Sequence, residues 1–437
     1  MKQIPAILEE KAAELETYYK ENYPGLAPLA KQCFLNTIET TVKQLEDGSY
    51  FVITGDIPAM WLRDSAAQVR HYLRYAKQDQ DLRNIIEGVI KKQVEFVNID
   101  PYANAFNESS NGMGHQDDTQ LNPSVWERKY EVDSLCAPLY LSYSYWKETG
   151  ISTIFTEDFL KMINTIIQVF TVEQKHENSP YYFRRYQCVK SDTLVNNGKG
   201  RPVNHTGMTW SGFRPSDDCT KFGYLIPANM MAVVALSNGE EICREIYKDD
   251  ETAGKCRTLL EEIKAGIEDY GIINYPGYGK IYAYETDGFG NYNLMDDANS
   301  PSLLAMPYLN YCGKKDELYQ NTRRFVLSKD NPYYCTGKYA SGVGSPHTPK
   351  GMVWHIGIVM QALTSTDDKE INDCLIMLAN THAGTNFCHE AFNPDDPADY
   401  TRSWFAWANS LFADLLIQLK ERNFFKQEGQ GVNNERK

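Results

Sequence analysis

The chain has 437 residues, enough for one large or two medium-sized domains, and a hydrophobic fraction of 42% can supply a sizeable core. A formal net charge of −14 excludes the concentrated basic field that a nucleic-acid binder needs, and it also disfavours an anionic membrane surface. Aromatic residues reach 12%, which suits either a large core or a surface that stacks on flat apolar faces such as those of sugars.

Cysteine usage and the N-terminus indicate a compartment. Ten scattered cysteines without a C-x-x-C pair are typical of buried free thiols, not of a disulfide framework or a zinc site. The first residues, MKQIPAILEEKAAELE, have the pattern of an amphipathic acidic helix instead of a signal peptide, and no apolar run has membrane-spanning length. We therefore expect a cytoplasmic protein with no membrane association. No linker divides residues 1–437, so we expect a single domain.

Apolar residues spaced three and four apart predict helices along most of the chain. The predicted helices cover residues 60–75, 134–148, 151–172, 228–247, 258–270, 351–363 and 403–418. Two long polar loops, 104–122 and 274–299, have a length that is usually functional in a compact protein. One β-hairpin is expected, with Asp287 and Gly288 as its turn. The pattern favours an all-α fold built as one α-barrel or toroid, with at most short β-hairpins.

The first motif, G-D-I-P-A-M-W-L-R-D-S, begins at residue 55. Pro58 marks a helix start, and Arg63 and Asp64 fall in the first two turns, with Trp61 one turn before Asp64. A carboxylate near a helix N-terminus is favoured by the dipole and can grip two vicinal hydroxyls of a sugar. The alternative is an ordinary ion pair at a helix start.

The second motif, residues 115–134, reads H-Q-D-D-T-Q-L-N-P-S-V-W-E-R-K-Y-E-V-D-S. Helical spacing from Trp126 would place Trp126, Tyr130 and Asp133 on one stripe with Glu127 beside it, either as a sugar subsite or as plain core. His115, Asp117 and Asp118, like the segment M-D-D-A-N at 295–299, offer donors for a hard cation. No H-E-x-x-H, P-loop lysine or EF-hand spacing is present, so we predict no metal and no cofactor.

The third motif, W-S-G-F-R-P-S-D-D, covers residues 210–218. Pro215 biases Arg214 away from helical geometry, and Ser216 or Asp217 is expected to cap a helix that runs toward residue 225. The remaining acid would lie against the aromatic wall of Trp210 and Phe213. A carboxyl desolvated in this way has a raised pKa and acts as an acid near neutrality.

The fourth motif, residues 386–410, places Glu390 between His389 and Phe392, ahead of a Pro- and Asp-rich loop and a predicted tryptophan-bearing helix. An acid among aromatic residues is costly to bury without a purpose, although a partly exposed loop glutamate is the plain alternative. Together, separated acids, aromatic rings and the lack of a cofactor motif fit glycoside hydrolysis, which needs two carboxyl groups across one bond.

These motifs, with Y-N-L-M-D-D-A-N-S-P-S-L-L and G-K-Y-A-S-G-V-G-S-P-H-T-P, run in order from about residue 50 to residue 412. The sequence resembles glycoside hydrolase family 125, the metal-independent exo-α-1,6-mannosidases. The resemblance implies an (α/α)6 barrel and an inverting mechanism on terminal α-linked mannose of an oligosaccharide. It places the general acid at Asp218, with Asp217 as the alternative, and the general base at Glu390. His355 stands where the family pattern has a proline, which could alter the edge of a subsite.

An inverting mechanism requires room for a water, so we expect carboxyl groups roughly 6.5–9.5 Å apart instead of the roughly 5–5.5 Å of a retaining enzyme. His389 leaves open a sugar epimerase or lyase on the same barrel, and a non-catalytic mannoside-binding protein is a further alternative. The residues that we expect to hold mannose are Trp61, Arg63, Asp64, Trp126, Glu127, Asp133, Arg214, Asp217 and His389, with His115, Asp117, Glu285 and His347 on loops.

Overall fold

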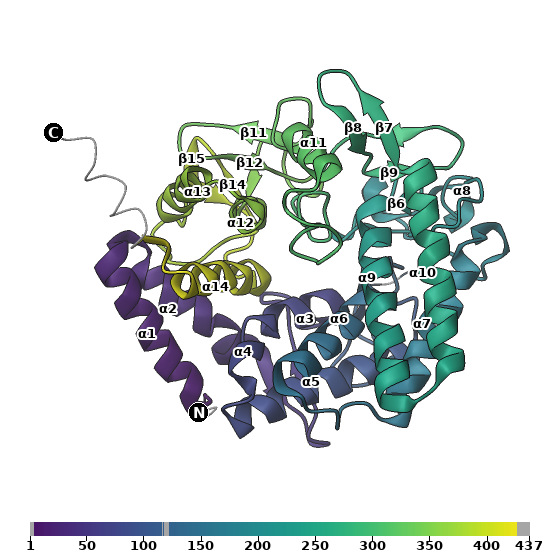
Figure 1. Cartoon of the computed structure of the whole chain (residues 1–437), viewed down its shortest axis with the longest axis horizontal. Coiled ribbons are helices and arrows are strands. Elements are labelled where there is room, and N and C mark those ends of the chain that lie inside the picture. The colour runs from purple at the N-terminus through teal and green to yellow at the C-terminus, as the bar shows by residue number, and fades with distance from the viewer. Residues whose placement is uncertain (1–3, 116, 118–121, 426–437) are drawn as a thin grey trace.

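The computed structural model describes residues 4–115, 117 and 122–425, and the fold is rich in helices (Figure 1). The α-helices are α1 (Ala6–Asn22), α2 (Ala27–Asn36), α3 (Leu62–Arg70), α4 (Leu73–Ala76), α5 (Gln80–Ile99), α6 (Val132–Thr149), α7 (Glu157–Glu173), α8 (Val195–Gly198), α9 (Ile226–Ile242), α10 (Asp250–Tyr270), α11 (Glu317–Val326), α12 (His355–Thr364), α13 (Asp368–Asn380) and α14 (Ala406–Glu421). Shorter 3-10 and π-helical turns are η1 (Pro24–Leu26), η2 (Thr37–Thr41), η3 (His176–Asn178), η4 (Lys190–Asp192) and η5 (Cys243–Tyr247).

Five helices pack side by side around the centre of the molecule. α6 packs against α3 and α9, α14 packs against α3 and α12, and α2, α10 and α13 cover α14, α9 and α12 from outside (Figure 1). Between α9 and α12 the inner position has no regular helix, because residues 303–311 form consecutive turns and bends. The helix-rich prediction is confirmed.

Short strands pair segments that are far apart in sequence. The sheets are β1 (Val42–Gln44) with β2 (Tyr50–Val52), β3 (Met60–Trp61) with β4 (Ala105–Phe106) and β5 (Val125–Glu127), β6 (Tyr224–Leu225) with β9 (Glu285–Thr286) and β10 (Tyr292–Asn293), β7 (Ile272–Tyr275) with β8 (Gly279–Tyr282), β11 (Tyr334–Thr336) with β12 (Ser341–Val343), and β13 (Val353–Trp354) with β14 (Ala391–Asn393) and β15 (Asp396–Tyr400). The predicted hairpin exists as β9–β10. The expectation that strands would occur only as short hairpins was wrong, because β3, β6 and β13 pair with strands that are distant in sequence.

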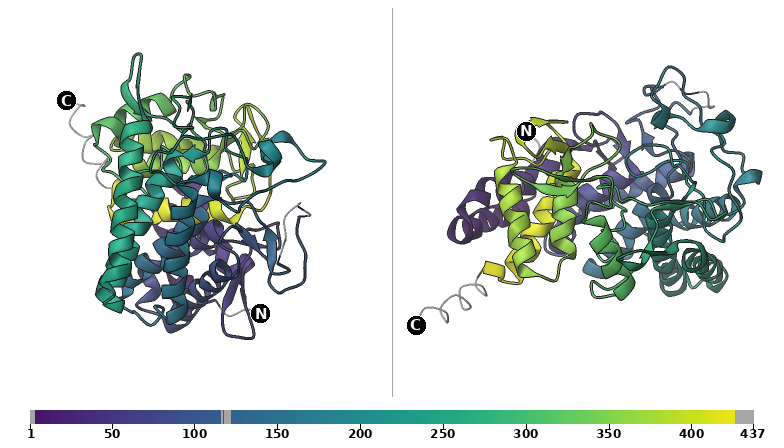
Figure 2. Two further views of the ribbon diagram at one scale, coloured as in Figure 1. Left: turned by 90° about the vertical axis from the view of Figure 1, so that its right-hand side faces the viewer. Right: turned by 90° about the horizontal axis from the view of Figure 1, so that it is seen from above.

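These strands position the helix entrances. β3, β6 and β13 lead directly into α3, α9 and α12, and each pairs antiparallel with a distant strand. Strands of two or three residues carry too little alternation to be recognised from sequence. Their pairing gathers the N-terminal ends of the central helices and the loops around them. The loops at 107–115 and 183–203 project from the same side of the molecule (Figure 2).

Two local predictions were wrong. The stripe from Trp126 to Asp133 is not one helix, because β5 contains Trp126 and α6 begins only at Val132. No helix follows Ser216 or Asp217 either. The chain turns sharply there, with the Arg214 amide donating to the Asp218 carbonyl at 2.8 Å, and an isolated bridge joins Phe213 to Cys219.

The aromatic residues of the W-S-G-F stretch belong to the core. The Trp210 ring stacks on His176 at 3.5 Å between centroids, and Phe213 packs edge-on against Phe183 at 4.9 Å. Both side chains are fully buried, so they anchor the turn at 214–218 instead of forming a wall beside its acids. All ten cysteines are free, as predicted. Among the described residues, no helix combines the length and apolarity that a membrane crossing requires.

Candidate active site

A small cavity of about 40 Å³ gathers residues from the first, third and fourth motifs. Its residues come from the N-terminal ends of α3 and α14 and from loops that include Asn299, after β10, and His347, after β12. Its lining residues are Thr54, Ile57, Trp61, Arg63, Asp64, Pro215, Ser216, Asp217, Asn299, His347, Trp354, Glu390, Arg402, Phe405 and Trp407. Five predicted binding residues and the predicted base therefore meet in one place.

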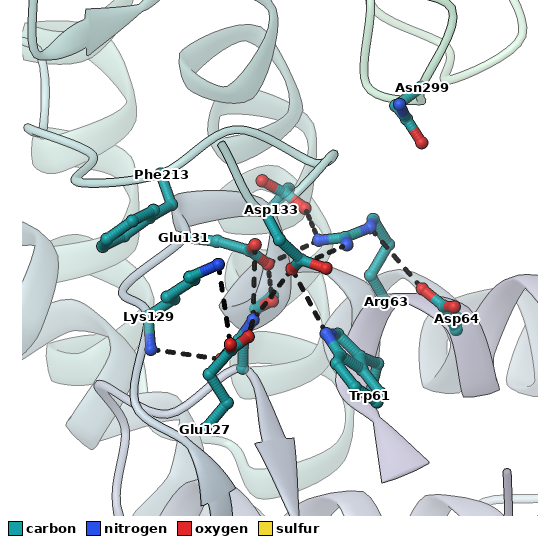
Figure 3. Close-up of polar contacts among 12 residues, drawn as sticks. Trp61, Arg63, Asp64, Glu127, Lys129, Glu131, Asp133, Phe213 and Asn299 are labelled. Atoms are coloured by element: carbon teal, nitrogen blue, oxygen red, sulfur yellow. Dashed lines mark hydrogen bonds and ion pairs between the residues drawn. The ribbon is translucent and has the colours of Figure 1, made fainter. Parts of the chain in front are cut away.

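Arg63 is the buried cation of this site (Figure 3). Its Nη1 contacts Glu131 and donates to Asp133 Oδ2 at 2.9 Å, while its Nε lies 3.7 Å from Asp64 Oδ1. Glu131 and Asp133 have no exposed side-chain surface, so they hold Arg63 from behind. Asp133 accordingly orients Arg63 and is not among the residues that line the cavity.

Asp64 lines the cavity on the other side of Arg63. Burial raises its pKa to about 6, and the charge of Asp217 adds to the rise, while Arg63 and Arg402 oppose it. A carboxyl with this pKa exchanges its proton close to neutrality. It can therefore donate to or accept from a sugar hydroxyl.

Asp217 faces the same cavity from the turn at 214–218. Its backbone has a φ of 68°, a left-handed conformation that aspartate tolerates and that turns its side chain toward α3. Oδ1 accepts from Trp61 Nε1 at 3.3 Å and from Asn104 Nδ2 at 3.0 Å. Burial would raise the pKa of Asp217, but Lys129 and Arg63 lower it below its usual range, whereas burial raises the pKa of neighbouring Glu131. The two cations therefore favour the anionic form of Asp217.

Asp218 points to a different partner. Its Oδ1 lies 3.2 Å from His347 Nδ1, and its side chain is 8% exposed. Burial lowers the pKa of His347, but the hydrogen bond to Asp218 and the charges of Asp218, Glu390 and Asp217 raise it to about 9. At neutral pH a proton is therefore held at the contact between these two side chains.

Glu390 immediately precedes β14, whose pairing with β13 and β15 fixes its backbone. Oε2 accepts from Thr401 Oγ1 at 2.9 Å, and Oε1 lies 3.5 Å from Arg402 Nη1. Both partners follow β15, so the last motif supplies the acid and the groups that orient it. The carboxylate is 8% exposed, into the cavity that Asp217 and His347 also line.

Arg214 and Glu285 form a buried pair behind the turn. Arg214 Nε donates to Glu285 Oε1 at 2.7 Å, and Oε2 accepts from the Lys221 amide at 3.0 Å. Arg214 also lies over the Tyr284 ring, 5.6 Å from its centroid. Neither residue lines the cavity of Glu390, so both predicted binding residues lie where they support the turn at 214–218.

Residues predicted from the second motif, at 115–134, form a neighbouring ion network. Arg185 donates to Asp117 Oδ1 at 2.7 Å and to Glu127 Oε1 at 2.8 Å. Lys129 lies 3.5 Å from Glu127, and Figure 3 shows these two side chains pointing toward each other. His115 is half exposed and lies 3.8 Å from Glu127. Trp126 is edge-on to His115, with its buried Nε1 lacking a partner among the described residues. Within the described ranges, no group of three or more potential ligands could hold a metal ion; Asp118 lies outside them.

His389 and His355 are buried together. The His389 ring stacks on Tyr400 at 3.7 Å between centroids and contacts Thr385 through Nε2. His355, the first residue of α12, contacts the backbone of His389 through Nδ1 at 3.0 Å and Thr381 through Nε2 at 3.2 Å. Neither lines the cavity of Glu390. His355 therefore supports the segment before Glu390 and does not form the edge of the cavity.

The cavity also contains residues that sequence reasoning missed. Arg402 pairs with Asp56 as well as with Glu390, and Arg63 lies over the Trp407 ring at 5.7 Å. Arg402, Phe405 and Trp407 belong to the fourth motif, residues 386–410, but nothing in their spacing marks them as cavity residues. Asn299 had a signal, since it ends the M-D-D-A-N segment that carried the cation hypothesis.

A larger cavity of about 1110 Å³ contains none of the predicted site residues. It lies at the C-terminal ends of α3, α6 and α14, away from Glu390, and includes Arg70, Tyr140 and Asp414. Although this cavity is larger, Glu390, Asp217 and the buried Arg63–Asp64 pair line the small cavity instead. The small cavity is therefore the candidate active site.

Comparisons with known proteins agree with this placement. A family model described as metal-independent α-mannosidase (GH125) matches residues 23–417. A metal-independent α-mannosidase of Streptococcus pneumoniae, solved in a non-productive complex with α-1,6-mannobiose, is 47% identical, with a TM-score of 0.93 over 98% of this chain and 100% of that one. The meiotically up-regulated gene 157 protein of Schizosaccharomyces pombe is 41% identical over 91% of this chain and 82% of its own length. A bacterial glucoamylase solved with acarbose shares the fold at a TM-score of 0.52 and 12% identity, covering 85% of this chain and 51% of its own.

The fold and the acidic cavity are those of a glycoside hydrolase built on helices. Within that class, the chain belongs to family 125, the metal-independent α-mannosidases. The resemblance seen in the sequence motifs is confirmed.

Proposed function

We propose that this protein is an inverting exo-α-1,6-mannosidase that removes terminal non-reducing mannose from oligosaccharides without a metal or another cofactor. One observation carries the proposal: a single cavity is lined by Glu390, Asp217, His347, Arg63 and Asp64. His347 also contacts Asp218. Family membership supplies the reaction class, and the α-1,6-mannobiose bound by the pneumococcal relative supports the linkage. We expect the enzyme to act in the cytoplasm as a single catalytic domain.

Glu390 is the proposed general base. Thr401 donates to its carboxylate and Arg402 forms an ion pair with it at 3.5 Å, while the group faces the cavity as an acceptor. A base of an inverting enzyme holds one water beneath the anomeric carbon and takes its proton as the water attacks. Contacts through two donors restrict the carboxylate to one orientation for that water.

Asp218 is the proposed general acid, with Asp217 as the competing residue. Asp217 is held as an anion by Lys129 and Arg63 and already accepts two hydrogen bonds, so it suits recognition of sugar hydroxyls. Asp218 instead shares a contact with His347, which carries a proton at neutral pH. A general acid needs access to a proton, and the contact of Asp218 with His347 provides one.

The remaining cavity residues are proposed to bind the terminal mannose. Trp61 and Trp407 offer aromatic faces, while Arg63 and Asp64 offer a donor and a carboxyl that titrates near neutrality. Behind them, Asp133 supports Arg63, and Arg214 with Glu285 supports the turn at 214–218. Glu127 accepts from Asn104 Nδ2, which also donates to Asp217. Exo action follows if the loops close the cavity beyond the non-reducing end.

We also propose that the chain forms an (α/α)6 barrel. The support is a second small cavity, of about 50 Å³, on which all five central helices and the turns at 300–309 converge. Its lining residues are Arg63, Ala66, Ala67, Arg70, Ala137, Tyr140, Leu141, Met231, Ser300, Tyr308, Leu309, Met360, Trp407 and Leu411. In the proposed barrel, the turns at 303–311 take the sixth inner position.

The proposal is tested with α-1,6-mannotriose labelled at its reducing end, in buffer containing a chelator. Stepwise loss of single mannose units from the unlabelled end is expected, and α-1,2- and α-1,3-linked controls should react far more slowly. Release of an unlabelled disaccharide first would contradict exo action. Loss of activity with the chelator would contradict metal independence.

A further inference from the structure

His347 contacts the proposed general acid Asp218 and lines the same cavity as the proposed base Glu390. It lies on the segment between β12 and β13, where its amide donates to Ser345 Oγ at 3.1 Å and prolines stand at positions 346 and 349. Its ring is edge-on to Trp354 at 6.5 Å between centroids, and Nδ1 reaches Asp218 Oδ1 at 3.2 Å. With 37% of its side chain exposed, His347 contacts both Asp218 and solvent.

We propose that His347 is a proton-relay residue, which supplies Asp218 with the proton that passes to the glycosidic oxygen and then takes a new one from solvent. This inference rests on the proposed function, because it assigns a role within the same cavity. Under it, the acid is the Asp218–His347 pair and not Asp218 alone.

An ordinary aspartic acid has a pKa of about 3.9 and is almost fully ionised at pH 7. A general acid that acts near neutrality therefore needs a raised pKa or a neighbour that stores a proton. The contacts of Asp218 provide such a neighbour, because the pKa of His347 is raised to about 9 by its hydrogen bond to Asp218 and by nearby negative charges, against the effect of burial.

The charges around His347 come from every segment that forms the cavity. Asp217 and Asp218 belong to the turn at 214–218, and Glu390 precedes β14; these three carboxylates raise the pKa of His347. The other charged lining residues are Arg63 and Asp64 on α3 and Arg402 after β15. Arg63 is engaged by Glu131 and Asp133, and Arg402 by Asp56, so both cations are largely neutralised by other partners.

The protons balance over one turnover. The His347 imidazolium transfers its Nδ1 proton to Asp218, and Asp218 donates a proton to the leaving oxygen as the glycosidic bond breaks. Water attacks the anomeric carbon and loses a proton to Glu390. Afterwards Glu390 releases its proton to solvent and neutral His347 takes one up, so the net reaction consumes only the glycoside and one water.

The test compares His347→Gln with wild type on two substrates. α-1,6-Mannobiose has a poor leaving group that requires protonation, whereas 2,4-dinitrophenyl α-mannoside has a leaving group that does not. We expect kcat on the disaccharide to fall by about 10²-fold or more and kcat on the aryl mannoside by less than about tenfold, as for loss of general-acid assistance. His205→Gln, an exposed histidine outside the site, is the matched control and should leave both values unchanged.

The pH profile provides a readout that a structural role would not move. The active, protonated pair exists below the pKa of His347 and is lost as the pH rises through about 9. We therefore expect the basic limb of kcat/KM to lie near that pH in wild type and to move to lower pH in His347→Gln. Equal losses on both substrates, or an unmoved basic limb, would overturn the relay.

A measurement on the wild type covers the case in which His347→Gln fails to fold. Histidine ring signals are followed by NMR as the pH is raised, and the His347 signal is identified by its change in Asp218→Asn. A midpoint well above 7 supports the relay, and a midpoint at or below 6.5 overturns it. Wild type that releases no mannose from any linkage would instead contradict the proposed function itself.

Discussion

Removing the Arg63 guanidinium should destabilise the fold strongly, because two fully buried carboxyl groups depend on it. In Arg63→Ala, Glu131 and Asp133 lose their shared cation, while Asp64 and Asp217 lose a nearby positive charge. Breaking a buried pair by removing one partner costs about 3–5 kcal/mol. Unfolding entropy of about 2.1 cal/mol/K per residue gives about 0.9 kcal/mol/K for 437 residues, so Tm should fall by about 3–6 °C.

The loss should depend on pH with a definite sign. Burial already raises the pKa of Glu131 and of Asp133 in the presence of Arg63, and without it both carboxyls take up protons more readily. The pKa of such a carboxyl is higher in the folded chain than in the unfolded chain, where it is near 4. Its contribution to stability is present below the unfolded-state pKa and is lost as the pH rises through the folded-state pKa. The Tm deficit of Arg63→Ala should therefore be small near pH 4.5 and large near pH 8.

Thermal unfolding followed by circular dichroism at these two pH values measures the effect. Arg244→Ala is the matched control, since Arg244 is about half exposed and pairs with Glu240, four residues earlier. Its loss should stay below about 1 kcal/mol at both pH values. A deficit in Arg63→Ala that is equally small, or that does not grow with pH, would refute the account of Arg63 as the cation on which this site is built.

Three further predictions concern the proposed acids and the buried histidines. Asp218→Asn should lower kcat on α-1,6-mannobiose by about 10²–10⁴ and spare an aryl mannoside with a good leaving group. Asp217→Asn should mainly raise KM. The opposite pattern would make Asp217 the general acid. Glu390→Gln should lower kcat on both substrates by a similar factor. Thr401→Val, which removes only the orienting hydroxyl, should lower kcat less. Equal activity of Glu390→Gln and wild type would exclude Glu390 as the base. Burial lowers the pKa of His71 to about 4 and of His355 to about 3, so both side chains stay neutral in the fold. The free energy of unfolding, measured with urea, should therefore fall as the pH drops below 6.5. The fall should be smaller in His355→Gln.

The sequence predicted the chemistry of the site better than its geometry. Glu390, Arg63 and Asp64 could be selected because an acid beside aromatic residues, or at a helix start, is a local pattern. The stripe from Trp126 to Asp133 was misread as helix because its three- and four-residue spacing is real, while β5 forms through pairing with β4 some twenty residues away. Propensity cannot reveal such a distant partner.

The aromatic residues near the acids were misassigned for a related reason. Trp210 and Phe213 adjoin the acids in sequence, but their rings point into the core against His176 and Phe183. The left-handed turn at Asp217 sends the acids to the opposite side. Arg402 and His347 become partners of Glu390 and Asp218 only through tertiary structure, so local spacing gave no contact to predict.

The anomer released from α-1,6-mannobiose tests the central claim most directly. Proton NMR in the presence of a chelator should show β-mannose first, followed by slow mutarotation to the α-anomer. That result would establish the linkage, inversion and the lack of a metal requirement together. Release of α-mannose first would mean retention, and the account of Asp218 and Glu390 acting across an intervening water would be wrong.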